Sequence, residues 1–345
     1  MINRLINKAL QLIGISIATI KIVFMKNNNY LDLMDDLQNC RIPPSILRNS
    51  SKGVVKNSRF LASQVIFIRT KKTTLDFTVT YSIRRVLENM SPLATSGIDI
   101  YKVDQNKFYW LGCFAPENKN QMIYNFTVTD LDKGDLICIL LPSYAKISHL
   151  YVGRTYAEID DFVGYQGEIT LYGSSITQGC SSSRPGLCYA NLLMTRYGYK
   201  IHNYGFSESA KGEEEIIEYI SSLNSNVFVL EYDHNASEDE LYKTHERVYR
   251  KIREKNPVST IILLSRISGG ISISYEEEER RSKIIKKTLS IAINEGDKKI
   301  SFIRGRDLVD NNPKLYLQDD RHPNDNGMKL IADAIYSELS RLEVN

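Results

Sequence analysis

Hydrophobic residues follow two different patterns along the chain. From residue 27 to about 161 they form short runs separated by polar turns, which is typical of half-buried strands. The seven runs are 64–69, 75–81, 97–103, 107–111, 122–129, 136–141 and 147–152. Turn residues separate them, as at 103–106 and 132–134. This spacing predicts an antiparallel β-sandwich domain over residues 27–161.

After the turn at 164–167, strand-like runs alternate with helical patterns. The strand-like runs are 169–172, 200–204, 226–231, 260–265 and 300–303. The clearest helix is predicted over 237–254, where Ser237 and Glu240 form a capping box and the buried stripe is Leu241, His245, Val248 and Ile252. A second helix is predicted over 276–287. Such alternation predicts a parallel sheet in a second domain, residues 162–345.

The first 26 residues form a separate segment with an uncharged apolar run over 9–20. Isoleucines alternate with small or polar residues there, which favours a strand or a packed helix. A signal peptide and an anchor are the two alternatives, although the run is too short for a membrane span and no clear cleavage site follows. We expect no stable membrane insertion and a cytoplasmic protein, or a secreted one if the run is a signal peptide.

Composition narrows the possible functions only slightly. The chain has 345 residues, 42% hydrophobic and 25% charged, which suits two soluble globular domains. A net charge of +3 is too small for a nucleic-acid footprint. The five cysteines and five histidines show no metal-ligand spacing, so we expect no metal, no other cofactor and reduced thiols. Cys180 and Cys188 could pair in an oxidising compartment.

The most informative short segment is Gly-Ser-Ser-Ile-Thr-Gln-Gly at 173–179, directly after a predicted buried strand. A serine at such a turn can act as a nucleophile, and the flanking glycines let a substrate carbonyl approach. Near the other end of the chain, Asp319 lies three residues before His322, so one loop can supply an acid and a base. Gly205 and Asn235 each follow a predicted strand. Carboxyl ends of parallel strands share one edge, where ligands bind.

These four blocks resemble the SGNH (GDSL-like) hydrolase family, in the branch with an N-terminal β-sandwich. The resemblance covers 168 to the C-terminus and implies a flavodoxin-like three-layer α/β domain preceded by a jelly-roll-like sandwich. It implies that Ser175 is the nucleophile, that His322 and Asp319 complete the triad, and that the Ser175 and Gly205 N–H groups and the Asn235 amide form the oxyanion hole. The chain departs from the family in reading Gly-Ser-Ser for Gly-Asp-Ser and Asp-His-Asn-Ala for Gly-x-Asn-Asp.

The implied function is hydrolysis of small acyl esters, acetyl-like and plausibly on a carbohydrate, through an acyl-enzyme. An acyltransferase on a sugar or natural-product hydroxyl and a non-catalytic glycan-binding protein are the alternatives. Ser174, His234 and Asp320 are rivals for the three triad positions, and Arg266 is a candidate substrate contact. The sandwich is expected to support the catalytic domain, with carbohydrate binding or gating as the alternative. A small-molecule or carbohydrate ester is the expected partner, and a homo-oligomer is possible.

Overall fold

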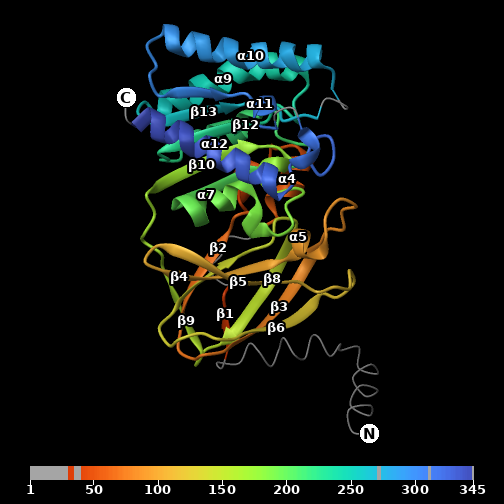
Figure 1. The fold of residues 1–345 in the computed structure, drawn as a ribbon, viewed down its shortest axis with the longest axis vertical. Coiled ribbons are helices and arrows are strands. Elements are labelled where there is room, and N and C mark those ends of the chain that lie inside the picture. Colours follow the sequence, from red (N-terminus) through yellow and green to blue (C-terminus); the bar gives the residue numbers. More distant parts are fainter. Residues whose placement is uncertain (1–29, 35–39, 270–272, 310–311, 344–345) are drawn as a thin grey trace.

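The computed structural model describes residues 30–34, 40–269, 273–309 and 312–343. It has two stacked domains, an antiparallel β-sandwich and a parallel sheet covered by helices (Figure 1). The expected segment 1–26, with its proposed strand, signal or anchor, lies outside the described residues. No helix among the described residues has the length and apolar character needed to cross a membrane.

The sandwich consists of two antiparallel sheets. The first has the order β1-β8-β3-β6 and the second the order β5-β4-β7-β2-β9. The strands of the first are β1 (Tyr30–Asp32), β8 (Ala145–Gly153), β3 (Leu75–Arg84) and β6 (Ile123–Val128). Those of the second are β5 (Lys107–Phe114), β4 (Ile98–Asp104), β7 (Leu136–Leu140), β2 (Val65–Thr70) and β9 (Ala157–Asp160). The seven predicted strands are confirmed, whereas β1 and β9 are short strands that the sequence pattern did not predict.

The inner strands of the second sheet, such as β2 and β7, are buried on both faces. In β2, Ile66 and Ile68 point into the core between the two sheets, while Phe67 points into the core shared with the other domain. In β7, Ile139 likewise points into the core between the two sheets, and Cys138 points into the core shared with the other domain. Because successive residues of a strand face opposite sides, a strand buried on both faces reads as a continuous apolar run. The two domains therefore share one hydrophobic contact surface.

The second domain contains a five-stranded parallel sheet with the order β11-β10-β12-β13-β14. Its strands are β10 (Gly167–Gly173), β11 (Tyr199–Gly205), β12 (Val227–Glu231), β13 (Thr260–Leu264) and β14 (Ile300–Ile303). Numbered within the domain, this is the flavodoxin-like order 2-1-3-4-5, so β10 and β12 flank the point where strand order reverses. The expected fold class is confirmed. Ligands bind at this point, beyond the carboxyl ends of the strands.

Helices cover both faces of the parallel sheet. One face packs against α7 (Tyr189–Tyr197) and α12 (Asp325–Glu343), with α7 on the side of the sandwich (Figure 1). The other face packs against α8 (Glu214–Ser221), α9 (Glu238–Lys255) and α10 (Tyr275–Asn294). The predicted capping box of α9 is present, and its predicted stripe is buried. α10 begins one residue before the predicted start at 276 and extends seven residues beyond the predicted end at 287.

Short helices fill the connections. They are α3 (Pro44–Leu47), α4 (Lys52–Ser58), α5 (Pro92–Ser96), α6 (Ser175–Gln178), α11 (Gly305–Val309) and the 3₁₀ turns Pro185–Leu187 and Pro313–Leu315. Arg41, which precedes α3, binds the second domain: its guanidinium donates to the carbonyls of Asn203 and Gly205, both at 2.8 Å. Burial lowers the pKa of Arg41 to about 10.

Candidate active site

Ser175 is the first residue of α6, and only Ser174 separates it from the end of β10. Ser174 caps this short helix, and Gly179 ends it in a left-handed conformation with φ of 104°. The first N–H groups of a helix have no acceptor within the helix. The Ser175 N–H is one of these groups, and only 9% of the residue is exposed.

His322 lies opposite Ser175 on the loop before α12. Its Nε2 is 3.0 Å from Ser175 Oγ, and its Nδ1 is 2.8 Å from Asp319 Oδ2. The other oxygen of Asp319 accepts hydrogen bonds from the N–H groups of Arg321 (2.8 Å) and His322 (2.7 Å). A proton on Nδ1 that is donated to Asp319 leaves Nε2 as the acceptor facing Ser175. The structure therefore brings together Ser175, His322 and Asp319 in the order that the sequence predicted.

The rival residues occupy other positions. Ser174 Oγ donates to Glu231 at 2.8 and 2.9 Å rather than facing a histidine. His234 lines the same cavity as Ser175, but its Nε2 accepts the N–H of Ile267 at 3.1 Å. Burial, reinforced by nearby cations, lowers the pKa of His234 well below its usual range. His234 is thus a neutral wall residue.

Glu231, a residue that the sequence analysis missed, lies beneath the turn that carries Ser175. It ends β12, is 2% exposed, and pairs in register with Gly173 of β10. Its carboxylate accepts hydrogen bonds from Ser174 N–H (3.1 Å), Ser174 Oγ and Thr177 Oγ1 (2.7 Å). A Cβ at position 173 would lie 2.1 Å from Thr177 Oγ1 and 2.7 Å from Glu231 Oε2, so only glycine fits there. Burial raises the pKa of Glu231 to about 7, although these hydrogen bonds oppose the rise.

Cys180 is a second residue missed at this site. Its buried thiol lines the cavity, contacts Asn89 and Ser181, and interacts electrostatically with His322. Burial opposes thiolate formation, but the contact with His322 outweighs it and lowers the pKa of Cys180. Burial likewise disfavours the imidazolium, but Cys180 and Asp319 together raise the pKa of His322. All five cysteines are free, so the suggested pairing of Cys180 with Cys188 is absent.

The three predicted oxyanion donors differ in their surroundings. Asn235 lines the cavity, and its side-chain nitrogen donates one of its two hydrogens to the carbonyl of Phe206 at 2.9 Å. The second hydrogen of this amide can be donated to a ligand. The Gly205 N–H instead donates to Asn203 Oδ1 at 2.8 Å, and Gly205 is not part of the cavity wall. A Cβ on Gly205 would lie 2.3 Å from the Gln178 nitrogen. In this structure glycine at 205 therefore serves the close packing of β11 against α6.

Glu208 lies in the cavity wall and has an unusual backbone conformation. Its φ is 61°, in the left-handed region that non-glycine residues rarely adopt. Among the described residues, no acceptor contacts its main-chain N–H. The next residue, Ser209, donates its N–H to Phe206 at 2.9 Å.

The cavity over Ser175 has a volume of about 340 Å³ and is built by both domains. Arg85, Leu87 and Asn89 from the segment after β3 form one wall. Asn89 donates to Ser181 Oγ at 3.0 Å, which ties this segment to the loop after α6. The sandwich therefore contributes directly to the site in addition to its expected supporting role.

Arg266, the candidate substrate contact, lies behind this cavity instead of lining it. Its N–H donates to Asp233 Oδ2 at 2.8 Å, and its guanidinium donates to the carbonyl of His234 at 3.1 Å. Asp233 also forms a buried ion pair with Arg281 at 2.7 Å. These contacts fix the loop that carries His234 and Asn235, so in this structure Arg266 supports the cavity from behind.

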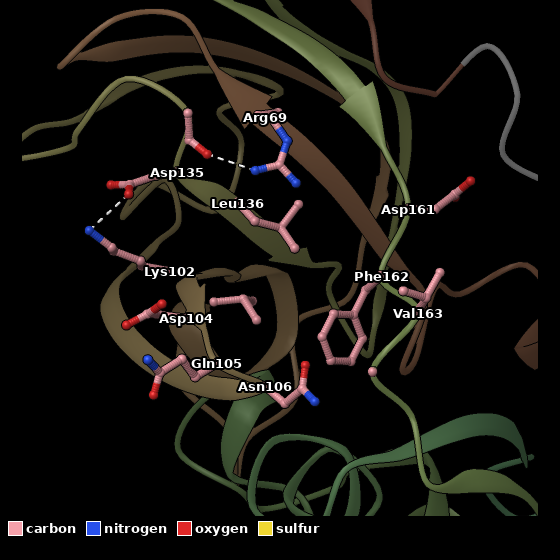
Figure 2. Close-up of a pocket in the computed structure, with 13 residues that line it drawn as sticks. Arg69, Lys102, Asp104, Gln105, Asn106, Asp135, Leu136, Asp161, Phe162 and Val163 are labelled. Atoms are coloured by element: carbon pink, nitrogen blue, oxygen red, sulfur yellow. Dashed lines mark hydrogen bonds and ion pairs between the residues drawn. The ribbon is translucent and has the colours of Figure 1, made fainter.

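A larger cavity of about 720 Å³ lies on the sandwich and shares no lining residue with the site (Figure 2). Its two cations and Asp135 are already paired. Arg69 contacts Asp160 at 2.6 Å. Arg69 also donates to the carbonyl of Gly134 at 2.7 Å, and Lys102 contacts Asp135 at 2.9 Å (Figure 2). Phe162 packs against other aromatic rings. Within the described residues, no cluster of histidine, cysteine or acidic side chains could hold a metal ion.

Comparison with known families matches both domains. Residues 166–340, about half of the chain, match the model of the GDSL-like lipase/acylhydrolase family. Residues 30–158 match the model of the N-terminus of SGNH-hydrolase-type esterases. No curated protein matches the sequence.

Solved structures share this two-domain fold at low sequence identity. A protein from Bacteroides ovatus ATCC 8483 described as a GDSL-like lipase is 22% identical with a TM-score of 0.80, covering 91% of this chain and 97% of that one. The salicylyl-acyltransferase SsfX3 from a tetracycline biosynthetic pathway is 16% identical, TM-score 0.74, with 92% and 96% covered. A family two carbohydrate esterase from Clostridium thermocellum, in complex with cellohexaose, is 12% identical, TM-score 0.56, with 80% and 91% covered.

Proposed function

Because the chain belongs to the GDSL-like lipase/acylhydrolase family, we propose that it is a serine ester hydrolase with Ser175 as its nucleophile. The observation that carries this proposal is the continuous chain of contacts from Ser175 Oγ through His322 to Asp319, with distances of 3.0 and 2.8 Å. Nucleophile, base and orienting acid within hydrogen-bond reach are what acyl transfer requires. The contacts lie at the strand-order reversal, where ligands bind in this fold.

In the proposed reaction, His322 Nε2 accepts the proton of Ser175 Oγ as the oxygen attacks the ester carbonyl. Asp319 holds the ring and stabilises the imidazolium that forms. His322 then gives the proton to the leaving alkoxide, which produces an acyl-enzyme and the free alcohol. Water, activated by the same histidine, releases the acid and restores Ser175.

The tetrahedral oxyanion needs donors that are not already used. We assign the Ser175 N–H and the second hydrogen of the Asn235 amide to this role. The Gly205 N–H is engaged with Asn203, so we assign the third donor to the Glu208 main-chain N–H, which has no acceptor among the described residues. Loss of one oxyanion donor typically lowers kcat by about 100- to 1000-fold. Asn235→Ala should fall in that range.

The test is hydrolysis of p-nitrophenyl acetate and butyrate, together with labelling by a serine-reactive phosphonate. Ser175→Ala and His322→Ala should both lose turnover, and Ser175→Ala should also lose the label. Ser222→Ala and His202→Ala, at surface positions outside the cavity, are the matched controls. A wild-type protein that neither turns over ester nor takes the label at Ser175 would remove the hydrolase proposal and favour a glycan-binding protein.

The finer substrate proposal is an acetyl-like ester on a carbohydrate, with acyl transfer to a hydroxyl as the second candidate. The same fold occurs in a carbohydrate esterase and in an acyltransferase. The wall contributed by Arg85, Leu87 and Asn89 gives an acceptor alcohol a surface to bind, which favours keeping the transferase candidate. Adding sugar alcohols to the ester assay separates the two activities, because a transferase forms a new ester product whereas a hydrolase releases only free acid.

A further inference from the structure

The wall of the cavity over Ser175 is positively charged. Its lining includes Arg85, Lys211 and Arg321, against one acidic side chain, Glu208. The other titratable lining residues are Cys180 and the two histidines, and of these His234 is held neutral by burial and by neighbouring cations that include Arg321. An excess of cations in a half-enclosed site raises the local concentration of anionic ligands.

Two of these cations lack a counter-ion in the described part of the chain. The Arg85 guanidinium lies over the rings of Tyr144 and Phe60, at 5.9 and 6.0 Å from their centres, and forms no ion pair. Arg321 donates its main-chain N–H to Asp319, but its guanidinium also has no ion pair among the described residues. Lys211 is partly neutralised by Glu240 at 3.1 Å.

Some half-buried arginines elsewhere in the structure pair with a carboxylate, unlike Arg85, which is also half-buried. Arg184 binds Asp99 at 2.7 Å, and Arg253 binds Asp297 at 2.8 Å. Behind the cavity, Arg281 pairs with Asp233, whereas the Arg266 guanidinium donates to main-chain carbonyls. Arg85 and Arg321 therefore bring cationic groups without a carboxylate partner, among the described residues, to the cavity over Ser175.

The two unpaired guanidinium groups come from opposite parts of the fold. Arg85 belongs to the sandwich, whereas Arg321 is adjacent to His322, the residue that protonates the leaving alkoxide in the proposed mechanism. An arginine fork binds carboxylate, phosphate or sulfate oxygens through two parallel hydrogen bonds, which fixes orientation as well as charge. A substrate that carries such a group would therefore be held from both domains.

We propose that the natural ester of this enzyme carries an anionic group that is bound by Arg85 and Arg321 with the aid of Lys211. This inference rests on the proposed function, because it names the substrate class of the same site. It also gives the sandwich a role in specificity, since it supplies Arg85.

The test uses pairs of esters that differ only in charge. The alcohol side is probed with 4-acetoxybenzoate and its neutral amide, 4-acetoxybenzamide. The acyl side is probed with the p-nitrophenyl monoester of glutarate and its glutaramate analogue. We expect kcat/KM to be at least about tenfold higher for the anionic member of one pair, which equals about 1.4 kcal/mol, and the pair that responds shows which side of the ester carries the charge.

Arg85→Gln and Arg321→Gln should each reduce this anionic-to-neutral ratio about tenfold, whereas Arg154→Gln, an exposed arginine outside the cavity, should leave the ratio as in the wild type. Arg321 is exposed, so its replacement tests the idea even if Arg85→Gln folds poorly. Equal rates within both pairs, or a ratio that neither substitution changes, would overturn the inference and leave the hydrolase intact. Failure of all four esters together with failed phosphonate labelling of Ser175 would overturn both proposals.

Discussion

Replacing Glu231 with glutamine should remove a pH-dependent loss of stability. Glu231 is fully buried beneath the Ser175 turn and accepts hydrogen bonds from Ser174 and Thr177. Burial raises its pKa to about 7, so the folded protein favours the protonated carboxyl, which a glutamine imitates in size and neutrality.

The magnitude follows from the difference between the folded and unfolded pKa values. The pKa of Glu231 rises from 4.5 to about 7. Stability is therefore fully present below pH 4.5 and is lost as the pH rises through 7, because the unfolded chain ionises first. At about 1.36 kcal/mol for each pKa unit, the full loss is about 3.4 kcal/mol, of which about 2.5 kcal/mol falls between pH 5 and pH 8.

The assay is urea unfolding of the wild type and of Glu231→Gln at pH 5 and at pH 8. Other groups also titrate between these pH values. The informative quantity is therefore the difference in unfolding free energy between Glu231→Gln and the wild type, and how that difference changes with pH. We expect Glu231→Gln to gain about 2.5 kcal/mol relative to the wild type on going from pH 5 to pH 8. Glu117→Gln, an exposed loop position, is the control and should show no such change. A constant difference between wild type and Glu231→Gln at both pH values would refute the reasoning.

Three further predictions concern the groups around the turn. Cys180→Ser should lower the pKa of His322, so that kcat/KM, which needs the neutral imidazole, persists to lower pH; a pH–rate profile with an unmoved acidic limb would contradict this. Arg281→Met leaves Asp233 buried without its ion-pair partner and should lower the free energy of unfolding by about 3–5 kcal/mol, as measured by urea titration. The double variant Arg281→Met/Asp233→Asn should recover part of this loss. Gly205→Ala places a Cβ 2.3 Å from the backbone of α6 and should cost about 1–3 kcal/mol and lower kcat/KM; unchanged thermal stability would show that the turn tolerates it.

Much of the fold follows from local sequence patterns. Helices such as α9 are long, periodic and capped, and strands such as β7 are apolar runs bounded by turns, so their presence and type can be predicted. The strands missed, β1 and β9, are three and four residues long and are stabilised by pairing with β8 and β2, partners distant in sequence. Local pattern carries no information about such pairing, because a short edge strand depends on its neighbour.

The proposed catalytic residues were predictable for a different reason. Ser175, His322 and Asp319 each occupy a short segment whose residue types are chemically distinctive, and parallel topology places the segments at one edge. Gly205 shows the limit of this argument, since a glycine after a strand can serve either a ligand or close packing, and only coordinates show that its N–H is engaged. The positively charged wall of the cavity could not be predicted from the sequence either, because Arg85 comes from the other domain.

Glu231 explains how the structure accommodates Gly-Ser-Ser in place of the family's usual Gly-Asp-Ser. The usual acid of Gly-Asp-Ser is replaced by Ser174, whose N–H and hydroxyl need acceptors once they are buried. Register pairs Gly173 with Glu231 on the neighbouring strand, and glycine at 173 leaves room for the Glu231 carboxylate beside Ser174 and Thr177. The carboxylate is thus supplied from β12 instead of from the turn. The sequence of the turn alone does not reveal this replacement, because Gly173 and Glu231 are 58 residues apart in sequence and adjacent only in the sheet.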